Sequence, residues 1–197
     1  MVYSKVMLKK EIELGLAVLK LDPIAIKTVA GKSRATVLGL LFLATPVVVN
    51  MLLGSLVFPS GFGAIFSRFL TWTIMIPVLS VLATVYVISL VGRKYYGLGL
   101  RFEPLLRVVG YAGLVTWLSV LPFLLAWIGL VDYAQLFGLV WFISIAWIFS
   151  VIFHYVEQNF TVSRQNIGIL LVVGFVTYVV FNAVLGDFFV GSSYRMF

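Results

Sequence analysis

The stretch RKYYGLGLRFEPLLRVVGYAG, from Arg93 to Gly113, lies between two long apolar runs and decides how the chain is laid out. Cations that flank apolar runs usually mark the cytoplasmic boundary of a membrane span. Proline in the first turn of a helix loses no hydrogen bond, so Pro104 marks a helix start. The glycines Gly92, Gly97 and Gly99 favour the end of the preceding helix. We therefore expect a cytoplasmic connection between two membrane helices.

The composition identifies a membrane protein. Hydrophobic residues make up 62% of the 197 residues and charged residues 11%, whereas soluble domains have about 25% charged residues. A single core of this size cannot enclose so much apolar surface, but lipid can surround it. The chain has no cysteine, which excludes disulfides and thiolate chemistry. Its net charge of +7 favours anionic lipid as the partner, and not nucleic acid, because the cations flank apolar runs.

Five stretches are long and apolar enough to cross a bilayer, which needs about 20 apolar residues. They run approximately over residues 35–57, 69–91, 105–131, 133–156 and 167–185. Backbone groups in hydrocarbon must bond within their own segment, and the alternation of a β-barrel is missing, so these stretches are expected to be helices. The sequence thus predicts an all-α integral membrane protein with a five-transmembrane-helix bundle over residues 35–197. Residues 1–34 form a basic, amphipathic cytoplasmic segment, and no cleavable signal peptide is expected.

The distribution of Lys and Arg predicts the orientation. With five spans, 12 of the 14 cations share one side, which places the N-terminus in the cytoplasm and the C-terminus outside. The cations expected at the lipid interface are Lys5, Lys9, Lys10, Lys20, Lys27, Lys32, Arg34, Arg93, Lys94, Arg101 and Arg107. Arg107, at the start of the third span, is expected to snorkel to the head groups. The alternative for the N-terminal cations is that they only enforce topology.

The N-terminal segment is expected to hold one or two short interfacial helices. Residues 5–20 gather apolar side chains on one helical face, although Glu11 intrudes on that face. The run EIELGLAV within it also fits an alternating strand. After it, Asp22 suits an N-cap, Pro23 suits the first helical position, and Gly31 suits the end of a short helix.

Candidate sites for chemistry are few. No ionisable residue lies near the middle of a predicted span, which argues against a proton- or sodium-coupled transporter, although coordination by backbone carbonyls stays open. His154 and Glu157 are three residues apart and share a helical face, so they are weak candidates for metal ligands or an acid–base pair. The chain has no second His and no Cys. We therefore expect no metal, cofactor or catalytic residue, and an interfacial His bonded to Glu or to water.

The segment FEPLLRVVGYAGLVTWLSVLPFLL, residues 102–125, resembles the YIP domain family of Ypt/Rab-interacting membrane proteins. The positions that carry the resemblance are Leu105, Leu106, Arg107, Val109, Gly110 and Tyr111. LKLDPIAIKTVAGKSRATVLGLLFL and WFISIAWIFSVIFHYVEQNFTVSRQNIGILL are also similar to that family. The resemblance implies five spans with an inward N-terminus, in a short prokaryotic-type form. Val115 and Thr116 replace the family's proline, and no DLYGP-type motif is found, so Rab binding is not implied.

Two functions remain open. The first is a non-enzymatic protein of a prokaryotic plasma membrane, acting by itself or as a subunit of a larger membrane complex. It organises membrane or docks partner proteins, or copies of itself, through helix faces and a basic cytoplasmic surface. The alternative is a channel or permease for a neutral or apolar solute, with helices kinked at Pro46, Pro77 and Pro122 as its wall. Because five spans form a poor pore, this alternative requires an oligomer.

Overall fold

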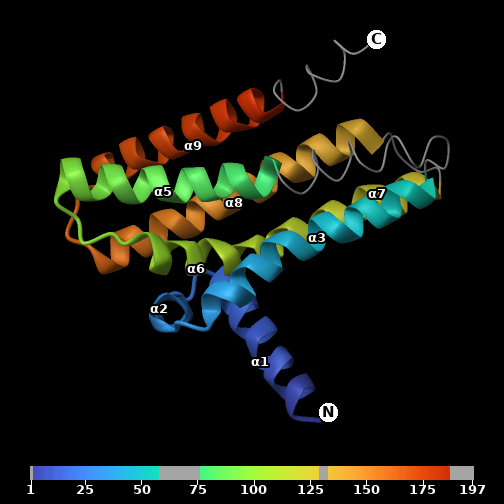
Figure 1. Ribbon diagram of the computed structural model, residues 1–197, viewed down its shortest axis with the longest axis horizontal. Coiled ribbons are helices and arrows are strands. Elements are labelled where there is room, and N and C mark those ends of the chain that lie inside the picture. Colours follow the sequence, from blue (N-terminus) through green and yellow to red (C-terminus); the bar gives the residue numbers. More distant parts are fainter. Residues whose placement is uncertain (1, 58–75, 129–132, 187–197) are drawn as a thin grey trace.

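The computed structural model describes residues 2–57, 76–128 and 133–186, and every regular element in those ranges is helical (Figure 1). In chain order the elements are α1 (Val2–Leu19), α2 (Pro23–Gly31), α3 (Ala35–Val57), α5 (Ile76–Tyr96), α6 (Phe102–Ala112), the 3₁₀ helix η2 (Gly113–Ser119), α7 (Val120–Trp127), α8 (Tyr133–Asn159) and α9 (Arg164–Gly186). The all-α prediction is confirmed.

Four helical segments are long and apolar enough to span a membrane: Ile76–Tyr96, Phe102–Pro122, Leu136–Asn159 and Arg164–Leu185. A fifth is added if α2 and α3, which meet at a bend of 112°, count as one span. The chain is therefore a multi-pass membrane protein, with four to five helices of membrane-spanning length within the described residues. The beginning of the predicted second span, residues 69–75, lies outside the described residues.

The N-terminal segment folds into two helices, so the strand interpretation of EIELGLAV is wrong. The predicted cap of α2 is confirmed, because the Asp22 carboxylate accepts hydrogen bonds from the backbone N–H groups of Ile24 and Ala25, at 2.8 and 3.3 Å. The start of α2 is therefore determined by neighbouring residues, an N-cap aspartate followed by a proline, and could be predicted from the sequence.

The second helix ends later than expected. α5 continues through Gly92 to Tyr96, and the chain turns at Gly97, whose φ of +62° is a left-handed conformation that glycine adopts without strain. The Leu98 N–H closes the turn on the Gly92 carbonyl, at 3.0 Å. The prediction that Gly92 breaks the helix is therefore wrong.

The third span is not one α-helix. α6 passes into the 3₁₀ helix η2 and then into α7. Thr116 and Ser119 donate their hydroxyl protons to the carbonyls three residues earlier, and Pro122 has no N–H to offer to Leu118. Both features disfavour the regular α-helical pattern, which explains why the expected single helix is interrupted here.

The helices pack in two groups that meet along α8 (Figure 1). α5 lies along α9, and α3 lies along α6, η2 and α7, while α1 extends away from the bundle. The α3–α6 contact is closest at Gly39 and Gly110. A Cβ built on Gly110 would lie 2.5 Å from the Gly39 Cα. This close crossing is possible because neither residue has a side chain.

Candidate functional site

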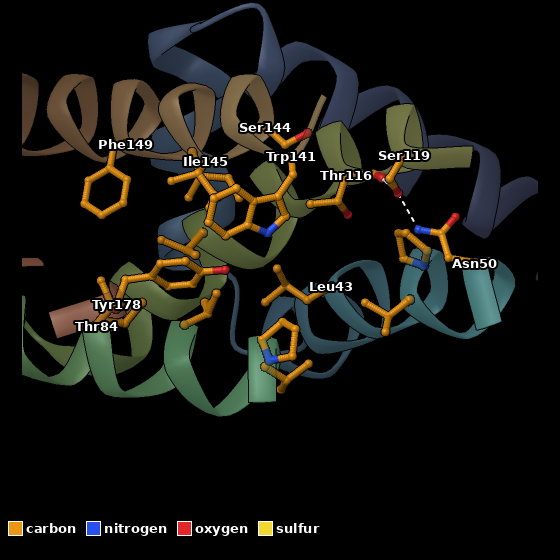
Figure 2. A pocket seen from close by; sticks show the side chains of 18 of the residues that line it. Leu43, Asn50, Thr84, Thr116, Ser119, Trp141, Ser144, Ile145, Phe149 and Tyr178 are labelled. Carbon is orange, nitrogen blue, oxygen red and sulfur yellow. Dashed lines mark hydrogen bonds between the residues drawn. The ribbon is translucent and has the colours of Figure 1, made fainter. Parts of the chain in front are cut away.

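A cavity of about 390 Å³ lies in the centre of the bundle, where α3, α5, α6, η2, α8 and α9 face one another (Figure 2). Its volume lies within the range of about 300–1,000 Å³ found for small-molecule pockets. The apolar residues that line it are Leu43, Pro46, Val47, Pro77, Val78, Val81, Val85, Val109, Phe137, Trp141, Ile145, Ile148, Phe149 and Ile152. Pro46 and Pro77 therefore both belong to its wall, and the cavity is predominantly apolar.

Three hydroxyl groups on the cavity wall donate their protons within their own helices. Thr84, Thr116 and Ser144 bond the carbonyl oxygens of residues 80, 113 and 140, at 2.7, 2.6 and 2.8 Å. The hydroxyl oxygens keep lone pairs that can accept a hydrogen bond. Among the described lining residues none carries a charge at neutral pH. The wall is therefore suited to a neutral molecule.

Asn50 is the most polar side chain of the wall. It is 5% exposed, and its Nδ2 donates to the Ser119 Oγ (Figure 2). The Ser119 hydroxyl proton is committed to the Thr116 carbonyl, so Ser119 must accept from Asn50 and the amide orientation follows. Within the described part of the chain, the Asn50 Oδ1 has no hydrogen-bond partner. A buried acceptor without a partner is unfavourable by about 1–3 kcal/mol.

A second polar cluster ties α1 to the bundle. Glu11 is 5% exposed and accepts hydrogen bonds from Lys32 and, at 2.5 Å, from the hydroxyl of Tyr111, which is fully buried. Burial alone would raise the pKa of Glu11. The bonds from Lys32 and Tyr111 outweigh it and lower the pKa below the ordinary value of 4.5. Glu11 stands on the apolar face of α1 because its partners lie beneath that face.

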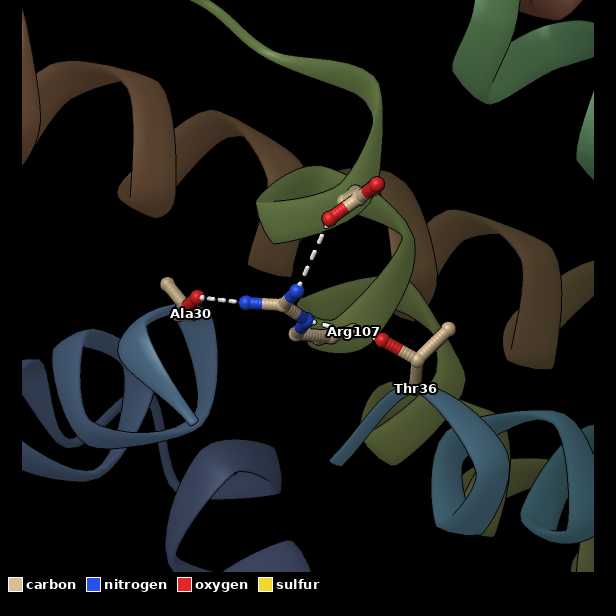
Figure 3. Close-up of polar contacts among 4 residues, drawn as sticks. Ala30, Thr36 and Arg107 are labelled. Carbon is tan, nitrogen blue, oxygen red and sulfur yellow. Dashed lines mark hydrogen bonds and ion pairs between the residues drawn. The ribbon is translucent and has the colours of Figure 1, made fainter. Parts of the chain in front are cut away.

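Arg107 lies inside the protein, with 11% of its side chain exposed. Its guanidinium donates to the Ala30 carbonyl at 2.9 Å, the Thr36 hydroxyl at 2.8 Å and the Glu103 carboxylate at 3.0 Å (Figure 3). These bonds join α6 to the end of α2 and the start of α3. The snorkelling conformation expected for Arg107 is therefore not observed, because its guanidinium is bonded to three protein acceptors instead.

Most other predicted interface cations are exposed: Lys9, Lys10, Lys20, Lys27, Arg34, Arg93, Lys94 and Arg101. Lys32 is partly exposed and pairs with Glu11. The side chain of Lys5 lies outside the described residues. The positions that carry the family resemblance, Leu105, Leu106, Arg107, Gly110 and Tyr111, are all buried and contribute to helix packing.

His154 and Glu157 do not bond each other. The His154 Nδ1 faces the Ser150 carbonyl at 3.0 Å, and Glu157 accepts from the Arg164 Nε at 2.7 Å. No group of three His, Asp or Glu residues able to hold a metal ion occurs in residues 2–57, 76–128 and 133–186. The structure therefore gives these two residues separate local contacts.

Asn50, Ser119, Thr84 and Ser144 are polar residues inside predicted spans, and the sequence gives no indication that they surround one cavity. The pairing of Glu11 with Tyr111 was missed, since 100 residues separate them. A charged residue on an otherwise apolar helical face was the one available signal.

Comparison of the chain with protein-family models, curated proteins and solved structures gives no match.

Proposed function

We propose that this chain is a multi-pass membrane protein that binds a neutral, largely apolar molecule inside its helix bundle, as a channel or permease for such a solute must do. The observation that carries the proposal is the central cavity of about 390 Å³, whose described lining is mostly apolar and has no charged side chain. Burying an ion there would leave it without a counter-charge, which is strongly unfavourable. A neutral apolar molecule gains from the same surface, by about 25 cal/mol per Å² of apolar area buried.

One wall position supports a passage and not only a binding site. Pro46 lies inside α3 and removes one of its backbone hydrogen bonds, so this helix can bend more easily beside the cavity. Pro77 is the second residue of α5 as described, a position where no intrahelical hydrogen bond is lost. We propose that a permease of this kind acts as an oligomer. Reconstituted protein should then conduct a neutral solute down its own gradient, with the same rate when all ion gradients are removed.

The binding step is tested by photolabelling of the protein in nanodiscs with an apolar diazirine probe. Val81 lines the cavity, while Val172 on α9 is 63% exposed on the outside of the bundle. Val81→Trp should fill the cavity and remove label from wall residues such as Ile145 and Ile148. Val172→Trp is the matched control and should leave that label unchanged. Labelling that is confined to outward-facing residues, or is equal in both variants, would refute the proposal.

A second candidate is the docking or membrane-organising role, and α1 provides its observation. Leu8, Ile12 and Leu16 form one strip along α1 and are 51%, 39% and 50% exposed. Lys9 and Lys20, which are exposed, lie beside this apolar strip on the helical wheel. Helices that bind anionic lipid have the same arrangement of an apolar strip next to cations. The similarity to YIP proteins and a cytoplasmic N-terminus belong to this proposal.

This candidate is tested by amide hydrogen exchange of α1 in nanodiscs with and without anionic lipid. Anionic lipid should slow exchange in α1, and Ile12→Asp should abolish the difference. Glu13→Asp, on the charged side of the same helix, is the control. Equal exchange in both lipids would exclude the lipid-bound form of this role.

A further inference from the structure

We infer that the molecule bound in the cavity carries a neutral carbonyl oxygen that accepts a hydrogen bond from the Tyr178 hydroxyl. The inference rests on the proposed function and deepens it, because it names the chemical class of the ligand: a ketone or an ester with an apolar body. Tyr178 lies on α9 and lines the cavity.

The first step is the position of the Tyr178 hydroxyl. The residue is 5% exposed. Its side chain extends from α9 toward the other lining side chains, and the hydroxyl oxygen is at the inner end, on the side of Trp141 (Figure 2). The two rings are neighbours, with a distance of 6.0 Å between their centroids. A molecule in the cavity can therefore reach this hydroxyl.

The second step is the hydrogen bonding of this group. A tyrosine hydroxyl can both donate its proton and accept a bond, whereas an indole N–H only donates. Trp141 therefore acts on the Tyr178 oxygen as a donor and does not take its proton. The Asn182 Nδ2 bonds the backbone carbonyl of Tyr178, at 3.0 Å. Within the described residues no oxygen accepts the Tyr178 hydroxyl proton. Because buried polar groups nearly always have a partner, this proton is available to an acceptor in the cavity.

The third step is the kind of acceptor. No charged side chain lines the described wall, so a carboxylate in the cavity would have no counter-charge, which is strongly unfavourable. An alcohol would accept the bond, but it brings a proton that needs a second acceptor. A carbonyl oxygen has lone pairs and no proton, so the bond from Tyr178 satisfies it. A neutral carbonyl group is therefore the simplest match.

The fourth step is the rest of the cavity. Its volume is about 390 Å³, and side chains such as Val81, Ile145 and Phe149 form most of its wall. A water bonded to Tyr178 would need two to four polar partners and would leave most of this volume unfilled. A molecule with one carbonyl group and an apolar body gives the hydroxyl its acceptor and also fills the apolar part.

The test compares 2-undecanone with 2-methyl-1-undecene as competitors of the apolar diazirine probe. The two molecules have nearly the same shape, but in the alkene a methylene group replaces the carbonyl oxygen. The nanodiscs consist of ether-linked phosphatidylcholine, which has no ester carbonyl, and free concentrations are corrected for the measured lipid partition. In the unmodified protein, the ketone should protect Ile145 and Ile148 at about tenfold lower concentration, the ratio that one net hydrogen bond of about 1.4 kcal/mol provides.

Variants assign the effect to Tyr178. Tyr178→Phe removes the hydroxyl and keeps the ring, so the preference for the ketone should disappear while the probe still labels the wall. Tyr155→Phe is the matched control, because Tyr155 is also buried, with 4% exposed, and lies outside the described lining. This variant should keep the preference of the unmodified protein.

A second readout is the infrared C=O stretch of isotope-labelled 2-undecanone, whose frequency falls when the oxygen accepts a hydrogen bond. The band at lower frequency should be present with the unmodified protein and with Tyr155→Phe, and missing with Tyr178→Phe.

The outcomes separate the inference from the proposed function. Equal competition by the two compounds, with the wall labelled, overturns the carbonyl requirement and leaves the apolar binding site in place. A preference that survives in Tyr178→Phe, or is lost equally in Tyr155→Phe, overturns the assignment to Tyr178. Absence of label from the wall removes the proposed function, and this inference with it. If Tyr178→Phe fails to fold, the comparison in the unmodified protein still decides whether a carbonyl is required.

Discussion

The crossing of α3 and α6 at Gly39 and Gly110 offers the sharpest test of the packing. In Gly110→Ala, the new Cβ would lie 2.5 Å from the Gly39 Cα and 2.7 Å from its carbonyl carbon. Ordinary van der Waals contact begins near 3.4 Å, so α3 must move away by about 0.9 Å. The obstacle is backbone, which cannot change rotamer, and both helices must shift together with everything packed on them.

The expected loss of stability is about 3 kcal/mol, the upper part of the range for overpacked cores. The reverse change is milder, because a Cβ on Gly39 would lie 3.1 Å from the Gly110 Cα, and about 1 kcal/mol is expected for Gly39→Ala. Gly138 in α8 has no neighbour within 4 Å of its added Cβ. Gly138→Ala should be neutral or slightly stabilising, since alanine is the better helix former by about 1 kcal/mol.

The measurement is unfolding of the three variants in one detergent, followed by circular dichroism while denaturant is increased. The order of stability should be Gly138→Ala, then Gly39→Ala, then Gly110→Ala. A Gly110→Ala protein as stable as Gly138→Ala would show that α3 and α6 do not approach closely at this crossing.

Three other changes test separate parts of the fold. Arg107→Lys loses the three hydrogen bonds of the guanidinium, so amide exchange at the α2–α3 junction should become about tenfold faster or more, as the loss of one charged hydrogen bond implies. Arg101→Lys, at an exposed position, is the control and should leave that exchange unchanged. Equal exchange in the two variants would contradict the role assigned to Arg107. Because the pKa of Glu11 is lowered in the folded protein, its stabilising contribution is present above pH 4.5 and is lost as the pH falls below that value. The protection of the α1 amides, measured relative to the intrinsic exchange rate at the same pH, should therefore fall on acidification in the unmodified protein but not in Glu11→Gln. If the protection of α1 in the unmodified protein does not change with pH, this linkage is disproved. Gly97→Ala places a side chain at φ +62° and should lower the stability of the protein in thermal unfolding by about 1–2 kcal/mol. Gly99→Ala is the control, and equal stability of the two variants would show that residue 97 does not adopt the left-handed conformation.

The helix boundaries that depend on neighbouring residues could be predicted from the sequence. Residues 35–57 form α3 as expected, and the Asp22 cap and Pro23 start of α2 are confirmed. These features follow from apolar length and capping, which act within one or two turns. The end of α5 was misplaced because both Gly92 and Gly97 are possible stops, and only the backbone conformation shows which one turns the chain.

Features that join distant parts of the chain could not be predicted. Arg107 stands at the start of a predicted span, where the sequence pattern favours a cation at the lipid interface. Its hydrogen bonds to Ala30 and Thr36 join residues more than 70 positions apart, so they could not be predicted. Likewise, Asn50 and Ser119 are 69 residues apart, so their contact and the cavity beside them depend on how α3 crosses the third span. Such contacts are set by helix packing and by the absence of side chains at Gly39 and Gly110.

The winding of η2 decides which side chains of the third span face inward. A 3₁₀ helix turns about 120° per residue and an α-helix about 100°. Over the seven residues Gly113–Ser119, an α-helix would leave everything beyond Ser119 rotated by about 140° and would shorten the span by roughly 3.5 Å. Asn50 would then face a different side of the third span and lose Ser119. The bundle keeps its hollow centre because one short segment is wound more tightly than its neighbours.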